Sequence, residues 1–170
     1  MLMQVPFIPK ELWPHEKEMV KQGLLKNITH EGSRHVIYEG TPTVAQDWEA
    51  VVYRHMGDSE LRFLLDENQL PDTQPYQTIV RGSEGLNYCK KYFGGGKQVD
   101  TEVTVIIEFV SEKTLIETLF QKFSKAEDGC MSHGLGSKAG KTLNLFNESI
   151  RTGKTTFRPI FVRRLLKKKR

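Results

Sequence analysis

The chain has 170 residues, of which 38% are hydrophobic and 27% charged, and it contains nine phenylalanines and two tryptophans. This length and composition predict one folded chain with a buried core and exclude a wholly disordered protein. No apolar run is long enough to cross a bilayer and no signal segment opens the sequence. We expect a protein that acts inside a cell, in the cytoplasm or the nucleus, while export as a module of a longer protein stays open. Its two cysteines, Cys89 and Cys130, are too few for a disulfide framework and favour a reducing compartment.

The net charge of +4 is unevenly placed along the chain. Residues 163–170 carry six positive charges, which exceeds the net charge, so the rest of the chain is slightly acidic. A basic end of this kind predicts contact with nucleic acid or an anionic membrane, or a nuclear localisation signal. The alternative is a solvated chain end with no partner.

The first 45 residues predict an N-terminal helical appendage. We expect a helix from about residue 11 to residue 26, because Pro14 suits its opening turn and Met19 and Leu24 lie on one side. Residues 34–38 predict a short strand, which the following Gly-Thr-Pro sequence ends.

Residues 46–164 predict the main domain, and residues 165–170 a basic tail. Residues 50–56 are rich in β-forming residues, and Leu61, Leu64 and Leu65 follow at helical spacing. Residues 103–110 form a nearly continuous apolar run, typical of a central strand. The other elements expected are strands at 76–80, 142–150 and 155–163, helices at 84–93 and 114–123, and a long loop at 124–142. This pattern indicates an α+β fold, with a mixed, mostly antiparallel sheet and short flanking helices.

The stretch GLGSKAGKT, residues 134–142, looks like a phosphate-binding loop but has the wrong spacing. A P-loop with this Gly140-Lys141-Thr142 ending needs a glycine at position 135, where Leu135 stands. We also expect no strand before it and no helix after it, whereas a P-loop joins such a pair. The stretch is therefore interpreted as a surface loop.

Three blocks of the sequence carry a family resemblance. The first is Val51-Val52-Tyr53-Arg54-His55-Met56-Gly57 with the helix start at 59–61, and the second is residues 76–83 with the helix at 86–92. The third is Phe146-Asn147-Glu148-Ser149-Ile150 with the strand after Gly153. Their types and order, over residues 50–164, resemble the motifs of ADP-ribosyltransferases, the NAD-using fold shared by bacterial toxins and poly-ADP-ribose polymerases.

The resemblance implies a split-sheet enzyme that cleaves NAD and transfers ADP-ribose to a protein or nucleic-acid acceptor. It gives Glu148 the role of stabilising the oxocarbenium-like ribose, with His55 as its catalytic partner. An alternative for Glu148 is an exposed carboxylate at the end of a strand. NAD enters as a substrate, and no metal is expected.

The resemblance also implies a set of NAD-binding residues. A guanidinium can pair with phosphate in a bidentate manner and tyrosines can stack on nicotinamide, although the tyrosines suit core packing as well. Because neighbouring strand residues point to opposite faces, only one of Arg54 and His55 faces the cleft, and we favour His55. The expected NAD-binding residues are Arg54, Tyr76, Thr78, Ser83, Tyr88 and Tyr92, with Arg81 near the pyrophosphate and Lys138 and Lys141 near the acceptor.

Two other functions remain open beside the transferase. The same fold could act as an NAD glycohydrolase with water as acceptor, or it could be an inactive binding module held to nucleic acid or membrane by residues 163–170. Cys130 and His133 form at best half of a zinc site, so metal binding is not favoured.

Overall fold

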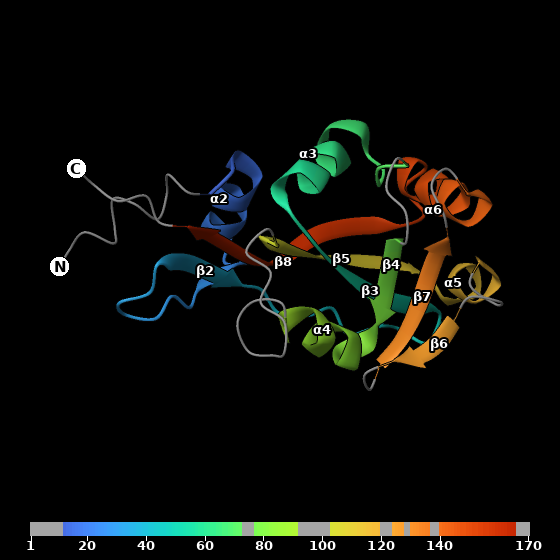
Figure 1. The fold of residues 1–170 in the computed structure, drawn as a ribbon, viewed down its shortest axis with the longest axis horizontal. Helices are drawn as coiled ribbons and strands as arrows, with labels where there is room; N and C mark the ends of the chain where they lie inside the picture. The colour runs from blue at the N-terminus through green and yellow to red at the C-terminus, as the bar shows by residue number, and fades with distance from the viewer. Residues whose placement is uncertain are drawn as a thin grey trace. The chain divides into compact units, whose positions relative to one another are not determined.

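The computed structural model describes residues 12–72, 77–91, 103–119, 124–127, 130–136 and 140–165 (Figure 1). The helices are α2 (Pro14–Lys21), α3 (Asp58–Glu67), α4 (Gly82–Lys90), α5 (Lys113–Leu119) and α6 (Lys141–Arg151). The strands are β1 (Lys26–Asn27), β2 (His35–Glu39), β3 (Glu49–Met56), β4 (Gln77–Arg81), β5 (Val105–Glu112), β6 (Ser124–Glu127), β7 (Cys130–Gly136) and β8 (Thr156–Leu165).

The chain divides into two compact units. The larger unit is Thr43–Arg158, and the smaller unit combines the residues up to Pro42 with those from Pro159 onward. The strand β8 thus begins in one unit and ends in the other. The residues at 159–165 share a unit with the N-terminal segment, which their place in the sequence did not indicate.

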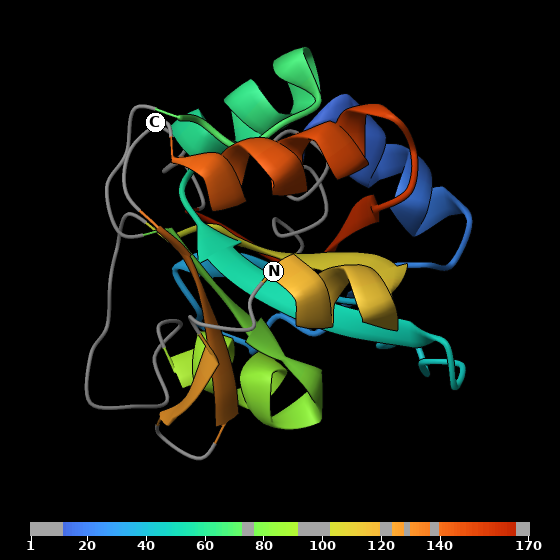
Figure 2. The same ribbon diagram turned by 90° about the vertical axis from the view of Figure 1, so that its right-hand side faces the viewer.

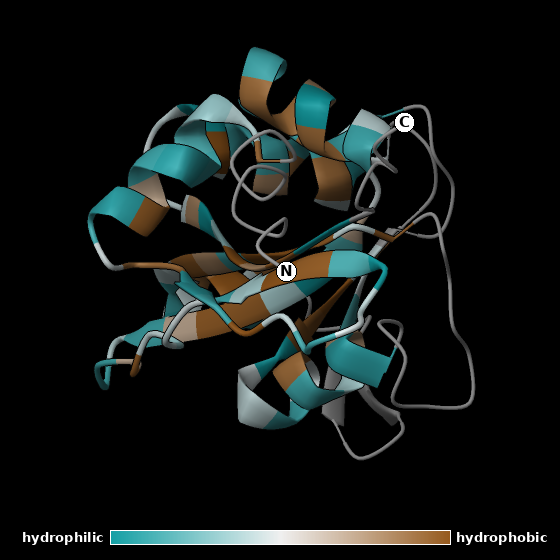
Figure 3. Ribbon diagram, turned by 90° about the vertical axis from the view of Figure 1, so that its left-hand side faces the viewer, coloured by the Kyte–Doolittle hydropathy of each residue, from teal (hydrophilic) through white to brown (hydrophobic). Residues whose placement is uncertain are grey.

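The larger unit is an antiparallel sheet between helices. Its strands lie in the order β5-β3-β4-β7-β6, and each neighbouring pair is antiparallel. The helices α3 and α6 cover one face and α4 lies on the other (Figure 2). We call the second face the α4 face. The strands are apolar along much of their length, whereas the helices alternate apolar and polar residues (Figure 3).

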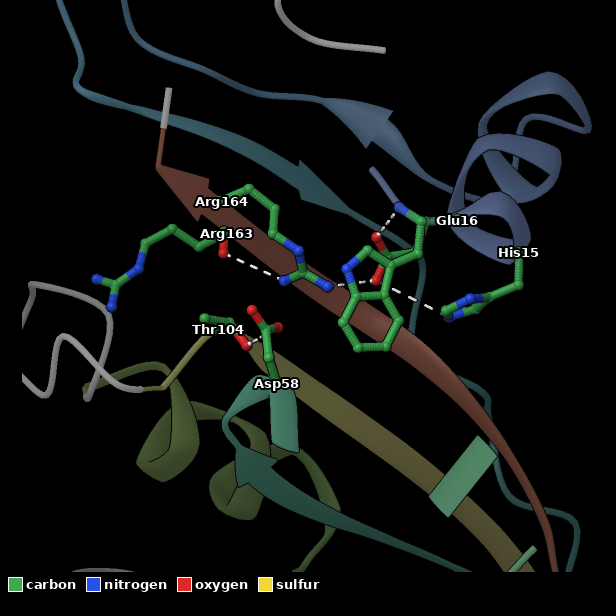
Figure 4. A network of polar contacts seen from close by, with 7 residues as sticks. His15, Glu16, Asp58, Thr104, Arg163 and Arg164 are labelled. Carbon is green, nitrogen blue, oxygen red and sulfur yellow. Dashed lines mark hydrogen bonds and ion pairs between the residues drawn. The ribbon is translucent and has the colours of Figure 1, made fainter. Parts of the chain in front are cut away.

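Buried side chains explain the helical layer on the face opposite α4. In α6 the apolar residues Leu143, Phe146 and Ile150 repeat at helical spacing and are all buried. Phe146 meets Phe109 of β5 edge-on, with ring centroids 5.4 Å apart. A further contact fixes the start of α3, where the Thr104 hydroxyl donates to Asp58 Oδ1 at 2.8 Å (Figure 4).

The smaller unit joins the two ends of the described chain. The strand β2 pairs antiparallel with both β1 and β8, and Tyr38 lies opposite Val162. Glu16 of α2 is fully buried and accepts a hydrogen bond from Arg164 Nη2 at 2.8 Å (Figure 4). The guanidinium of Arg164 also lies 5.2 Å from the ring centroid of Trp13, at cation–π distance. Residues from opposite ends of the sequence therefore form this core together.

The expected α+β class and the antiparallel pairing are confirmed, and several elements lie where they were predicted. The strands expected at 50–56 and 103–110 correspond to β3 and β5. Helices were expected near those now seen as α2, α3, α4 and α5. In the part of the chain that the structure describes, no helix is both long and apolar enough to cross a membrane.

Two predictions for the C-terminal half are wrong. The strand expected at 142–150 is the helix α6, because its apolar residues are spaced by three and four positions and not by two. The loop expected at 124–142 contains the strands β6 and β7. Their polar, glycine-containing sequences carry little β-propensity, and β7 forms because it pairs with β4.

The setting of GLGSKAGKT also differs from the expectation. Its first three residues are the end of the strand β7 and its last two begin the helix α6, so the expected absence of a strand before it and of a helix after it was wrong. The spacing of the glycines still excludes a P-loop, because Leu135 occupies the position that needs a glycine. Lys138 lies outside the described residues, and Lys141 is exposed in the first turn of α6.

Candidate functional site

The α4 face of the sheet brings together residues from three elements of the larger unit. Tyr53 and His55 lie two positions apart on β3 and so point to the same face. Val80 of β4 is paired with Tyr53, which puts Thr78, two positions away, on that face too. The helix α4 packs over it, and the ring centroids of His55 and Tyr88 are 6.3 Å apart, with the rings tilted by 53°.

A close approach of α4 to β4 positions Tyr88. A Cβ atom at Gly85 would lie 2.7 Å from the Val80 carbonyl carbon, so only glycine lets the helix come this near. Gly82, the first residue of α4, has a φ of +71°, a left-handed conformation that favours glycine. Both glycines serve the turn from β4 into α4 and hence the placement of Tyr88 beside His55.

A buried carboxylate lies on the same face, next to Tyr53. Glu108 of β5 is opposite Tyr53 in the antiparallel register and is 0% exposed. It accepts hydrogen bonds from the Tyr53 hydroxyl at 2.9 Å, the Thr43 amide at 2.8 Å, the Thr43 hydroxyl at 2.5 Å and Arg158 Nε at 2.9 Å. Arg158 Nη2 donates to the Thr43 hydroxyl at 3.1 Å, which closes the network.

This network explains how a charged residue can occupy the middle of an apolar strand. A buried carboxylate is costly unless it is paired and hydrogen-bonded, and Glu108 has four such contacts. Burial, then the neighbouring Glu108 charge and its hydrogen bond, raise the pKa of Tyr53 above its usual range. Tyr53 therefore stays a neutral donor. Sequence reasoning missed this network, although a lone glutamate in the run Val105–Val110 was a visible signal.

Arg54 points to the opposite face, as alternation along the strand requires. Its guanidinium donates through Nε and Nη2 to the carboxylate of Glu60, with the second contact at 3.0 Å. Nη1 donates to the backbone carbonyl of Thr78 at 2.9 Å. Arg54 thus contacts Thr78 through the Thr78 backbone carbonyl. Its guanidinium forms an ion pair with Glu60, on the face of the sheet away from His55.

Glu148 lies away from His55 and Tyr88. It is an exposed residue of α6, the helix that covers the face opposite α4 (Figure 2). Its neighbours Asn147 and Ser149 are buried instead: Asn147 bonds both backbone groups of Leu70, and the Ser149 hydroxyl lies 2.8 Å from that of Thr155. The placement on a strand is corrected, and the geometry does not join this carboxylate to the α4 face.

The remaining candidates are distributed as follows. Ser83 is exposed in the first turn of α4. Tyr76 and Tyr92 lie outside the described residues. His133 is buried on β7, where burial and then the charge of Arg81 lower its pKa to about 4. Among the residues that the structure describes, no group of three or more His, Cys, Asp or Glu could hold a metal ion.

Comparison with known proteins adds no further assignment. No family model matches the chain, and neither a curated protein nor a solved structure matches it.

Proposed function

We propose that the chain is an NAD-dependent ADP-ribosyltransferase whose site lies on the α4 face around His55. One observation carries the proposal: His55, Thr78 and Tyr88, expected separately from the sequence motifs, share one face of the larger unit, where the His55 and Tyr88 rings are in contact. They come from β3, β4 and α4 respectively. The antiparallel α+β architecture supports the resemblance at a coarser level.

The chemistry suits this set of side chains. The glycosidic bond of NAD breaks, nicotinamide leaves with the bonding electron pair, and a nucleophile of the acceptor bonds to the ribose carbon and loses a proton. The Tyr88 ring would stack on nicotinamide, and the imidazole of His55 would hydrogen-bond a ribose hydroxyl. With water as the acceptor, the same site would be an NAD glycohydrolase.

The carboxylate of this reaction is no longer assigned to Glu148, and Arg54 is no longer assigned to NAD binding. Glu148 is exposed on the helical layer across the sheet, and Arg54 is bound to Glu60. The proposal therefore rests on His55 and Tyr88 as the residues that contact NAD.

The test measures nicotinamide release from NAD and transfer of ADP-ribose to protein or nucleic acid in a cell lysate. His55→Ala should lower kcat/KM about 100-fold, in the range of a lost general acid–base or ribose contact. Tyr88→Ala should raise KM, while Tyr88→Phe keeps the stacking ring and stays near wild type. Glu148→Gln separates the two assignments, since a large loss in this variant would return the role to Glu148.

A second candidate is an NAD- or ADP-ribose-binding module without activity. This candidate is favoured by the state of Glu108, the buried carboxylate on the α4 face. Its four hydrogen-bond donors are all protein groups, so the carboxylate is directed at the protein and not at a substrate. Saturation-transfer NMR with NAD and ADP-ribose would show binding that Tyr88→Ala abolishes, together with no nicotinamide release. If wild-type protein shows neither binding nor release, both candidates are wrong.

A further inference from the structure

The segment at 43–48 of the larger unit is anchored at both ends. At one end Thr43 donates its amide and hydroxyl to the buried Glu108 carboxylate. At the other end the Trp48 carbonyl accepts a hydrogen bond from the Lys113 amide at 2.8 Å. Between them the Gln46 carbonyl accepts from the Glu49 amide at 3.0 Å. The backbone of this segment is thus held at three points.

This anchored turn exposes large apolar side chains. Val44 is 85% exposed and Trp48 62% exposed, the highest values among the exposed large hydrophobic residues of the described chain. An exposed tryptophan on an ordered backbone gains contact area on binding at a small entropic cost, and tryptophan is enriched at binding hot spots. The turn therefore has the character of a contact surface.

Three acidic residues lie next to Trp48 in the sequence or in the strand register. Asp47 is exposed beside it, and Glu49 and Glu112 are direct partners in the register of β3 and β5, which puts two carboxylates opposite each other at this end of the sheet. Like charges placed opposite each other destabilise an antiparallel pair. A cationic partner would relieve this repulsion, and an arginine or lysine could also lie over the Trp48 ring.

We propose that the Trp48 surface, made of Val44, Asp47, Trp48, Glu49 and Glu112, docks a lysine- and arginine-rich segment of a partner protein. The charge is complementary, the indole supplies the anchor, and the anchored turn supplies preorganisation. The inference does not depend on NAD chemistry, and it uses none of the residues assigned to the α4-face site. A nucleic acid or an anionic membrane does not fit, because its phosphates would meet the carboxylates.

The experiment measures fluorescence polarisation of a labelled hexa-arginine peptide, with hexa-glutamate as the opposite-charge control. Wild-type protein should bind hexa-arginine in a salt-dependent manner and should not bind hexa-glutamate. Trp48→Ala should weaken binding by about 30-fold, the effect of a hot-spot residue. The double variant Glu49→Gln/Glu112→Gln should weaken it by roughly tenfold, since charge pairs near the surface each contribute only modestly.

A matched variant controls for the loss of charge, and four outcomes would contradict the proposal. Glu31→Gln/Glu67→Gln removes the same charge from two exposed positions elsewhere and should bind as wild type does. Equal losses in both double variants, or no loss in Trp48→Ala, would show only general charge attraction. Stronger binding after removal of residues 166–170 would assign the surface to the chain's own basic end. Binding to phosphatidylcholine vesicles that needs Trp48 would assign it to a lipid surface. Each of these results overturns the proposal.

Discussion

Tyr53 and Glu108 face each other across β3 and β5, and the phenol donates a hydrogen bond to the buried carboxylate at 2.9 Å. The same carboxylate holds Thr43, so it ties the turn at 43–48 to the middle of the sheet. It also lies on the face that carries His55, two positions along β3. One buried charge thus supports both surfaces for which we propose a function.

Replacing Glu108 should destabilise the larger unit strongly. Glu108→Gln keeps the size of the side chain but leaves Arg158 without its carboxylate, and one Gln cannot accept all four hydrogen bonds. Breaking a buried ion pair costs about 3–5 kcal/mol, and we expect about 2–3 because Arg158 is partly exposed. Urea unfolding measures this change. Glu112 is exposed and lies two pleats further along the same face of the strand. Glu112→Gln should therefore change the free energy of unfolding by less than about 0.5 kcal/mol.

The raised pKa of Tyr53 should make stability fall in alkali. In the unfolded chain a tyrosine loses its proton near pH 10, whereas in the folded protein Tyr53 keeps it to higher pH. The unfolded state therefore binds fewer protons above pH 10, and the free energy of unfolding must decrease there. Urea unfolding at pH 9, 10 and 11 should show this slope, and Tyr53→Phe should reduce it. Tyr38, whose pKa burial also raises, keeps part of the slope in the variant. Identical slopes in the two proteins would contradict the assignment.

The lowered pKa of His133 should make stability fall in acid. Its folded pKa of about 4 lies below the ordinary value of 6.5, so the unfolded state binds more protons between these two pH values. The contribution of His133 is present above pH 6.5 and is lost as the pH falls toward 4. Thermal unfolding from pH 7 to pH 4 should therefore show a smaller decrease in Tm for His133→Asn than for wild type. His15 and His35, whose pKa values burial also lowers, should retain part of the dependence.

Adding a methyl group to Gly85 should disturb the site as well as the fold. The new Cβ would lie within 3 Å of the Val80 backbone, so α4 has to move away from β4. We expect a loss of about 1–3 kcal/mol, the usual effect of overpacking, and a displaced Tyr88. Differential scanning calorimetry and the NMR shifts of His55 measure the two effects. Ser83→Ala, at an exposed position of the same helix, should leave both near wild type.

The accuracy of the sequence-based predictions followed the strength of the local pattern. β3 contains β-forming valines and a tyrosine and β5 is a nearly continuous apolar run, and these local patterns allowed both strands to be predicted. α6 was mistaken for a strand since Thr142, Leu143 and Asn144 suggest alternation, while the helical spacing appears only over the whole segment. β7 pairs with β4, about 50 residues earlier, and no local pattern encodes that partner. Its pairing with β6 had a local signal that was overlooked, the Asp128-Gly129 dipeptide between the two strands.

The candidate site was predictable only in part. The ring contact of His55 and Tyr88 agrees with the grouping drawn from the motifs. The partner of Arg54 could not be inferred, because the choice between an ion pair with Glu60 and a ligand depends on the face of the strand and on the helix that packs there. Glu108 was overlooked because its neighbours are apolar, and its donors come from residues 50 to 65 positions away.

The ion pair between Glu16 and Arg164 joins residues 148 positions apart, which constrains how the protein can be made. A ribosome adds roughly 5–20 residues per second, so Glu16 is synthesised about 7 to 30 s before its partner exists. Until then the segment that carries α2 and β2 has no β8 to pair with. The smaller unit can therefore be completed only after synthesis has reached the last strand, whatever the speed at which the larger unit folds.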